Sequence, residues 1–371
     1  MVLTRPDTFL ADAGYFSEDN VDAVTEAGID PLIATGRQKH TKKGRADYAR
    51  RKAIVEPAGT RAEAREPGAS GQPQPIPTPA PSLTPVALHP LLADPTVRLE
   101  RLDVPGGPLA VLRREPIDGV RRGTVLLVPG YSGSKEDFRL LLEPLAAAGH
   151  PVVALDQRGQ FQSPGAEDLA AYTTDALGAD VLAVVDAIGA GPLHLVGHSF
   201  GGLVARAALL ARPAAFRSLT LIGSGQAGLT GPRVEMLALL GPLLRQGGMP
   251  AVVEVMDALN AEDARFLALD ASFQTFLRDR MLAASPRALL GMADALTQEP
   301  DRVEALRATG VRVLVLHGAA DDAWTPALQA EMAQRLGAAY AVIPDAVHSP
   351  AVENPGATAA ALLAFYRAVD S

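Results

Sequence analysis

The sequence predicts an α/β fold for residues 96–371: a mostly parallel sheet with helices on both faces and a helical insertion after the sixth strand. Two observations predict this fold. Short apolar runs alternate with helical patterns from about residue 95 onward, and strands that are apolar on both faces are typical of a parallel sheet covered by helices. The alternation stops for about ninety residues after residue 222, where only helical patterns occur.

Seven short runs are predicted to be strands. Residues 97–104 and 108–114 alternate between apolar and polar side chains, which favours antiparallel strands at one edge of the sheet. The other five runs are rich in leucine or β-branched residues: 124–128, 152–155, 193–196, 219–222 and 311–316. Because ligands bind at the carboxyl ends of parallel strands, the polar residues that follow these runs are the candidates for a functional site.

The insertion is predicted to be a helical cap at about residues 226–306. Apolar residues recur there at helical spacing over residues 234–244, 251–259, 273–283 and 287–296. An insertion at this point of the chain lies over the carboxyl ends of the strands. Its methionines are expected either to face an apolar substrate or to pack the cap onto the sheet: Met236, Met249, Met256, Met281 and Met292.

The first 95 residues differ in composition from the rest of the chain. Ten of the 30 prolines fall in residues 56–95, and proline lacks an amide donor and fixes φ, so this segment is predicted to be an extended linker. Residues 1–55 hold few large apolar groups and are predicted to be poorly ordered. The basic run from Arg37 to Lys52 fits either a solvated tail or a nucleic-acid contact.

Composition limits the chemistry and the partners. The 371 residues carry a net charge of −8, so the chain as a whole has no electrostatic attraction to nucleic acid or to an anionic membrane. The absence of cysteine excludes disulfides, thiolate metal ligands and cysteine nucleophiles. The first residues lack the features of a signal peptide, and no uninterrupted apolar stretch is expected to span a bilayer. We therefore expect a cytoplasmic protein that binds no membrane, and the sequence does not indicate its oligomeric state.

The most informative motif is a G-x-S-x-G pattern centred on Ser199. A predicted buried strand, residues 193–196, precedes it, and a predicted helix, residues 203–210, follows it. A serine on so sharp a strand-to-helix turn is lifted out of the sheet, and the crowded turn needs glycines such as Gly197 and Gly201. This context favours a nucleophile elbow over a turn that contains serine by chance.

Two residues near the C-terminus complete a candidate catalytic set with Ser199. Asp321 follows the strand that ends at residue 316, and His348 lies further along the chain. A serine hydroxyl is a weak nucleophile until a base takes its proton, and His348 is the candidate base because an imidazole titrates near neutral pH. Asp321 is predicted to orient the imidazole and to stabilise its charged form. Asp322, which directly follows, is the alternative acid.

Residues 95–371 resemble the α/β-hydrolase family, and several features in the right chain order carry the resemblance. They are a loop at residues 128–133 like the family's oxyanion loop, a D-x-R-G turn at residues 156–159, the elbow at Ser199, and the G-x-x-D of residues 318–321 with His348 after it. The resemblance implies the α/β-hydrolase sheet with its cap.

The resemblance also implies a function: a serine hydrolase that cleaves a carboxylic ester or similar acyl compound through an acyl-enzyme. It implies a small-molecule acyl substrate, no cofactor, no metal, and an oxyanion hole made by the backbone N–H groups of Tyr131 and Phe200. Acyltransferases, perhydrolases and C–C bond hydrolases share the triad and stay open as alternatives, as does a non-catalytic binding protein. Serine at position 199 excludes haloalkane dehalogenases and epoxide hydrolases, which use aspartate at the elbow.

Two positions depart from the family pattern. Pro129 stands where many relatives carry histidine, and Phe161 stands where the family often has a second glycine. Neither belongs to the triad, but both reshape the loops beside it. Phe161 and Trp324 are expected either to line the substrate pocket or to belong to the core.

The first 52 residues resemble part of an insertion-sequence DDE transposase, on the stretches 10–20 and 33–40. In such enzymes the aspartate that corresponds to Asp12 is one of three carboxylates that hold two metal ions. The segments that carry the other two carboxylates do not accompany these stretches. The resemblance therefore implies a remnant without transposase activity.

Overall fold

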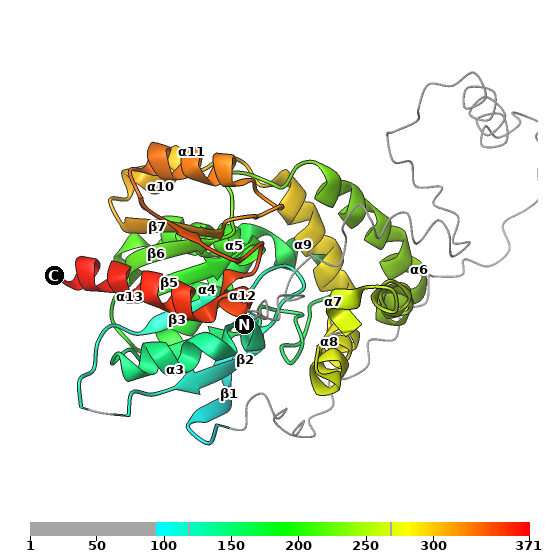
Figure 1. Cartoon of the computed structure of the whole chain (residues 1–371), viewed down its shortest axis with the longest axis horizontal. Coiled ribbons are helices and arrows are strands. Elements are labelled where there is room, and N and C mark those ends of the chain that lie inside the picture. The colour runs from blue at the N-terminus through cyan, green and yellow to red at the C-terminus, as the bar shows by residue number, and fades with distance from the viewer. Residues whose placement is uncertain (1–93, 118, 268) are drawn as a thin grey trace, which may run out of the picture. The chain divides into compact units, whose positions relative to one another are not determined.

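The computed structural model describes residues 94–117, 119–267 and 269–371 of the chain (Figure 1). Two predicted segments lie outside the described residues: the transposase-like segment with its basic run, and the proline-rich linker up to residue 93. The α/β pattern predicted from residue 96 onward lies within them and is confirmed.

An eight-stranded sheet forms the centre of the fold, in the order β1-β2-β4-β3-β5-β6-β7-β8. β1 (Val97–Val104) is antiparallel to β2 (Gly107–Arg114), which is antiparallel to β4 (Val152–Leu155). All other neighbours are parallel, and they add β3 (Val125–Val128), β5 (Leu193–His198), β6 (Phe216–Ile222), β7 (Arg312–Gly318) and β8 (Ala339–Ile343). The seven predicted strands are all present.

β8 was not predicted from the sequence. Its five residues include two alanines, which are poor strand formers, and they begin two residues after Gly337, which ends a helix. β8 pairs only with β7 and lies at the edge of the sheet, where Tyr340 and Val342 are 42% and 46% exposed. A strand at an edge needs no apolar residues on both faces, so its pattern is weak.

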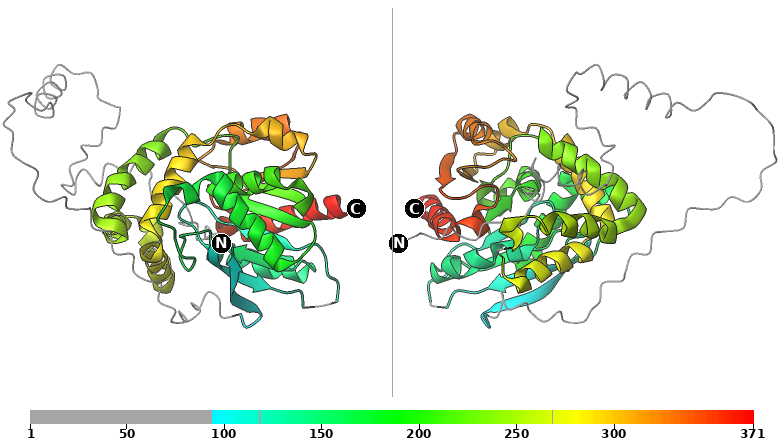
Figure 2. Two further views of the ribbon diagram at one scale, coloured as in Figure 1. Left: turned by 180° about the vertical axis from the view of Figure 1, so that it is seen from behind. Right: turned by 45° about the vertical axis from the view of Figure 1, so that its right-hand side comes forward.

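Helices cover both faces of the sheet (Figures 1 and 2). One face carries α4 (Thr174–Ile188), α5 (Phe200–Ala211), α10 (Val303–Ala308) and α11 (Pro326–Leu336), and the other carries α3 (Arg139–Ala147), α12 (Pro350–Glu353) and α13 (Pro355–Asp370). Successive strand residues face opposite sides: Leu126 of β3 belongs to the first core and Leu127 to the second. This alternation explains why the central strands are apolar along their whole length.

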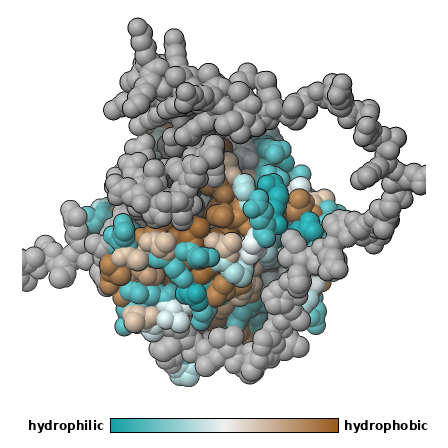
Figure 3. Space-filling view, turned by 90° about the vertical axis from the view of Figure 1, so that its right-hand side faces the viewer, coloured by the Kyte–Doolittle hydropathy of each residue, from teal (hydrophilic) through white to brown (hydrophobic). Residues whose placement is uncertain are grey.

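In the described part of the chain, five helices lie between β6 and β7. The first four fill most of the predicted insertion, and we call them the cap helices: α6 (Pro232–Asn260), α7 (Ala264–Leu267), α8 (Ala271–Ala283) and α9 (Pro286–Gln298). They lie together beside one end of the sheet, and apolar and polar residues both reach the surface on their side of the molecule (Figures 1 and 3). Met249, Met256, Met281 and Met292 are at most 6% exposed and belong to the core on the α5 side. These four methionines pack the cap helices onto the body of the fold.

One described stretch, Arg233–Asn260 in α6, is long and apolar enough to cross a membrane by length and composition. No such stretch was expected from the sequence. α6 is two helical pieces joined at Gly248, where φ is 64° and ψ is −157°, as the separate patterns of residues 234–244 and 251–259 predict. Core helices of soluble proteins pass the same test, and we assign α6 to the cap.

A buried histidine lies near the amino end of β5. His194 is fully buried, its ring stacks on Tyr366 at 4.2 Å between centroids, and its Nδ1 lies 2.8 Å from Ser218 Oγ. Burial lowers the pKa of His194 to about 4, and Asp370, at 3.6 Å, opposes the change only in part.

We expect His194 to make the fold sensitive to acid. The folded pKa lies below the ordinary value of 6.5, so the unfolded chain binds more protons between these values and the free energy of unfolding falls as pH falls from 6.5 to 4. The loss amounts to about 3 kcal/mol at pH 4. Urea denaturation from pH 7 to pH 4 should show a shallower fall for His194→Gln than for the wild type. Parallel profiles would contradict the assignment.

Candidate functional site

The predicted elbow is present in the structure. Ser199 joins β5 to α5 with φ 53° and ψ −122°, a conformation that few residues other than glycine adopt. A Cβ at Gly197 would lie 2.3 Å from the carbonyl oxygen of Gly201, and a Cβ at Gly201 would lie 2.3 Å from that of Pro129. Both positions therefore require glycine, and the close backbone approach holds Ser199 at the carboxyl end of β5.

Asp321 and His348 lie on loops that follow neighbouring strands. Asp321 follows β7, His348 follows β8, and the Nδ1 of His348 is 3.0 Å from Oδ1 of Asp321. The amide of Gln329 on α11 donates to the other carboxylate oxygen at 2.9 Å, and the N–H of Ala323 donates to Oδ1 at 3.0 Å. The carboxylate is thus held from three sides.

Electrostatics keeps Asp321 charged. Burial by itself raises its pKa, but the attraction and hydrogen bond of His348, together with the donors Ala323 and Gln329, outweigh it and leave the pKa below the ordinary value. A charged carboxylate accepts the proton of Nδ1, so Nε2 is the ring nitrogen of His348 that can accept a proton.

The Asp321–His348 pair lies next to the elbow. The N–H of Ser199 donates to the carbonyl oxygen of Ile222 at 2.8 Å, and a Cβ at the next residue, Gly223, would lie 3.3 Å from Nδ1 of His348. Nε2 of His198, the neighbour of Ser199, is 2.8 Å from the carbonyl oxygen of His348. The structure therefore brings together the three residues that the sequence nominated, all of them at most 4% exposed.

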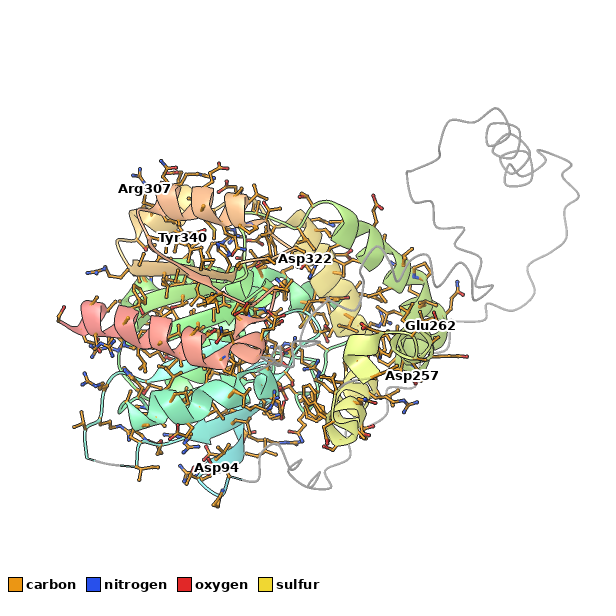
Figure 4. The ribbon with its side chains drawn as sticks, viewed as in Figure 1. Asp94, Asp257, Glu262, Arg307, Asp322 and Tyr340 are labelled. Carbon is orange, nitrogen blue, oxygen red and sulfur yellow. The ribbon has the colours of Figure 1, made fainter. Side chains whose placement is uncertain are left out.

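The alternative acid, Asp322, has a different partner. Its carboxylate is 2.6 Å from the guanidinium of Arg233 on α6, and its side chain is 57% exposed. Figure 4 labels Asp322 on the side of the sheet that faces the cap helices. The contact with His348 is made by Asp321.

The two predicted oxyanion donors belong to the start of α5 and to the loop after β3. Phe200 is the first residue of α5, where backbone N–H groups have no partner within the helix. Tyr131 follows β3 and is 3% exposed, and its hydroxyl donates to the carbonyl oxygen of Leu289 on α9 at 2.9 Å. The loop predicted to carry an oxyanion donor is thus in contact with α9 of the cap helices.

The two aromatic residues predicted near the pocket both contact the insertion. Phe161 has φ 36°, and its ring lies edge-on to Phe276 of α8, 5.7 Å between centroids. Trp324 donates from Nε1 to the carbonyl oxygen of Ala227 at 3.2 Å, and its ring centroid is 6.4 Å from that of His348. Their role in a pocket stays a prediction.

A buried charged cluster supports the turn after β4. Asp156 and Lys135 are both fully buried, with Nζ 2.8 Å from Oδ2, and Glu136 lies 2.9 Å from the same ammonium. Burial raises the pKa of Asp156 to about 6 although Lys135 opposes the change. The ammonium also lies 4.7 Å from the centre of the Phe161 ring. The cluster connects this turn to the segment after the oxyanion loop.

Sequence reasoning missed several supporting residues. Gln329 holds Asp321, and Arg280 of α8 forms a 2.6 Å ion pair with Asp137. Gln157 and Gln160, within the D-x-R-G turn and beside it, donate to backbone carbonyls of the oxyanion loop. These contacts join residues far apart in the chain, and only the turn's own motif points toward the glutamines.

Over the parts of the chain that the structure describes, no group of three or more histidine, cysteine, aspartate or glutamate residues is arranged to hold a metal ion.

Comparisons with known proteins place the fold. The model of the "Alpha/beta hydrolase family" matches residues 125–361. The chain is 40% identical to "Epoxide hydrolase B" of Mycobacterium tuberculosis over 81 residues, which cover 22% of this chain and 23% of that protein. Three further curated relatives are matched over 40%, 6% and 60% of their own length.

Solved structures resemble the described fold over most of the chain. A thermophilic esterase from Thermogutta terrifontis has a TM-score of 0.61 and 23% identity and covers 74% of this chain and 100% of its own. The enol-lactonase from Burkholderia xenovorans has a TM-score of 0.62 and 22% identity and covers 72% of this chain and 100% of its own. These likenesses confirm the predicted fold class.

The ion pair between Arg280 and Asp137 is expected to stabilise the contact between α8 and the segment after the oxyanion loop. Their side chains are 2% and 7% exposed, so Arg280→Met removes the buried cation that faces the carboxylate of Asp137 and should cost about 3 kcal/mol. Arg278→Met is the matched control, because its pair with Asp257 on the same cap is about half exposed and should cost under about 1 kcal/mol (Figure 4). If urea denaturation shows equal decreases in the free energy of unfolding for the two variants, the buried pair contributes no more to stability than the exposed pair.

Proposed function

The chain belongs to the alpha/beta hydrolase family, and from that premise we propose that it is a serine hydrolase that cleaves a carboxylic ester or similar acyl compound through an acyl-enzyme. One observation carries the proposal: the Asp321–His348 hydrogen bond of 3.0 Å lies beside a strand-to-helix turn on which Ser199 has φ 53°. A buried aspartate that orients a histidine next to a serine on such a turn is the arrangement that this chemistry requires.

The first step forms the acyl-enzyme. Nε2 of His348 takes the proton of the Ser199 hydroxyl as Oγ attacks the acyl carbon, and it then gives that proton to the leaving alcohol. Asp321 keeps the imidazole in the tautomer with Nδ1 protonated and stabilises the imidazolium. In the second step the histidine activates water, which releases the acid and restores the serine.

Charge develops on the acyl oxygen in both steps. We assign its stabilisation to the backbone N–H groups of Tyr131 and Phe200, which lie after β3 and at the start of α5. Hydrogen-bond donors that are already in place before the reaction need not reorient as the charge develops. Losing one such donor typically lowers the rate about 10²- to 10³-fold.

The proposed substrate is a small acyl compound, and the apolar residues of the cap helices favour an apolar acyl group. The names of the two structural neighbours, an esterase and an enol-lactonase, agree with ester cleavage. Acyl transfer, perhydrolysis and C–C bond cleavage use the same triad and are the alternatives, whereas a non-catalytic binding protein has no need of all three residues. We also propose a cytoplasmic location for the protein.

A fluorophosphonate probe tests the nucleophile. We expect one adduct on the intact wild-type chain and none on Ser199→Ala, because only an activated serine attacks the probe. Ser224→Ala is the control: Ser224 is fully buried beside the elbow and has no role in the proposal, so this variant should react like the wild type. A folded wild type that forms no adduct would move the binding-protein alternative to the front.

Substitutions at two neighbouring positions test which aspartate is the acidic residue of the triad. Asp321→Asn should lower kcat for p-nitrophenyl butyrate by about 10⁴-fold, since the imidazole loses its tautomer and its partner charge. Asp322→Asn should leave kcat within about twofold, because Asp322 pairs with Arg233 and not with His348. The reverse result would place the catalytic acid at position 322.

A further inference from the structure

We propose that Gln160 is a positioning residue for the oxyanion hole: its side-chain amide fixes the peptide whose N–H is the donor at Tyr131. The proposal rests on the serine-hydrolase function proposed above. The Nε2 of Gln160 lies 2.6 Å from the carbonyl oxygen of Gly130 and 3.1 Å from that of Tyr131. One side chain therefore holds two consecutive peptide groups of the loop.

The geometry of the peptide bond makes the first of these contacts decisive. The carbonyl of Gly130 and the N–H of Tyr131 belong to the same planar trans peptide, so they point in opposite directions. A donor that captures the carbonyl oxygen from one side therefore directs the N–H to the other side. Rotation of this peptide would turn a carbonyl oxygen toward the developing oxyanion, where it would repel the charge.

The orientation of the Gln160 amide follows from its own partner. Its Oε1 accepts the backbone N–H of Gln157 at 3.0 Å, which only the oxygen of the amide can do. The nitrogen must then face the loop, so the two amide ends cannot be exchanged. Gln160 is 2% exposed, and water does not compete for these contacts.

The turn that carries Gln160 is itself rigid. The N–H of Gln160 donates to the carbonyl oxygen of Gln157 at 2.9 Å, and the N–H of Ser163 donates to the carbonyl oxygen of Gln160 at 2.8 Å. Asp156, at the start of the turn, is held by the buried ammonium of Lys135. The side chain of Gln160 thus projects from a fixed base.

Gln157 performs a related task one peptide earlier. Its Nε2 donates to the carbonyl oxygen of Pro129 at 2.8 Å, and the N–H of that peptide belongs to Gly130. Gln157 thus anchors the base of the loop, whereas Gln160 sets the donor peptide itself. This difference makes Gln160 the residue to test.

The test compares three substitutions at position 160 in the full chain. Gln160→Met keeps the length of the side chain and removes the donor, Gln160→Glu keeps its shape and replaces the donor by an acceptor, and Gln160→His retains a ring N–H. We expect kcat for p-nitrophenyl butyrate to fall about ten- to a hundred-fold in the methionine and glutamate variants, with KM within about threefold. The histidine variant should recover part of the loss.

The affinity for a boronic acid provides a second measurement. It should not change if Gln160 only stabilises the fold. Butylboronic acid forms a tetrahedral anionic adduct with an active serine, and its affinity should fall by the same factor as kcat. Gln274→Met is the matched control, because Nε2 of Gln274 in α8 also bridges two carbonyl oxygens, those of Phe266 and Leu269, both at 3.0 Å. This control should lose stability and keep kcat and boronate affinity.

Two results would overturn the proposal in distinguishable ways. If the wild type reacts with the fluorophosphonate probe and Gln160→Met retains wild-type kcat and boronate affinity, Gln160 has no positioning role and the proposed function stands. If the folded wild type neither reacts nor hydrolyses the ester, the proposed function fails and this inference fails with it. Should Gln160→Met not fold, the comparison of Gln160→His with Gln160→Glu decides by the same criteria.

Discussion

The candidate site depends on the close packing of backbone around Ser199. The start of α5 lies so near the end of β3 that a Cβ at Gly201 would be 2.3 Å from the carbonyl oxygen of Pro129. The same contact brings the start of α5, with Phe200, against the segment that leads from β3 to Tyr131. A single steric constraint thus sets the position of Ser199 relative to the two segments that carry the proposed oxyanion donors, because no side chain separates these segments.

Motifs with fixed local spacing could be predicted from the sequence. The strand, turn and helix around Ser199 each leave a pattern within about twenty residues, and the structure has all three. Asp321 and His348 were nominated by their order in the chain and lie 3.0 Å apart. β8 was not predicted because an edge strand is not required to be apolar on both faces.

Contacts that hold the site in place could not be predicted in the same way. Arg280 reaches Asp137 across 143 positions of sequence, and Gln160 reaches Gly130 across 30. The local sequence around a glutamine in a turn is the same whether its side chain faces solvent or a carbonyl oxygen. Its role is set by the tertiary packing of two loops and cannot be predicted from that local sequence. The proposed nucleophile and base could be predicted from short motifs, whereas the residues that fix their surroundings become apparent only from the fold.

The cost of burying charge beside the site explains why the supporting turn is rigid. Asp156 and Lys135 are both removed from water, and Nζ of Lys135 lies 2.8 Å from the carboxylate of Asp156 and 2.9 Å from that of Glu136. A movement of the turn after β4 that separated Asp156 from Lys135 would leave a buried carboxylate without its cation, which costs more than the loss of an ordinary hydrogen bond. The ion pair therefore restrains the turn, and Gln160, four residues beyond Asp156, lies in the restrained segment. An oxyanion hole whose donors are fixed before the substrate arrives gains the most from such a support, because no binding energy is then used to align them.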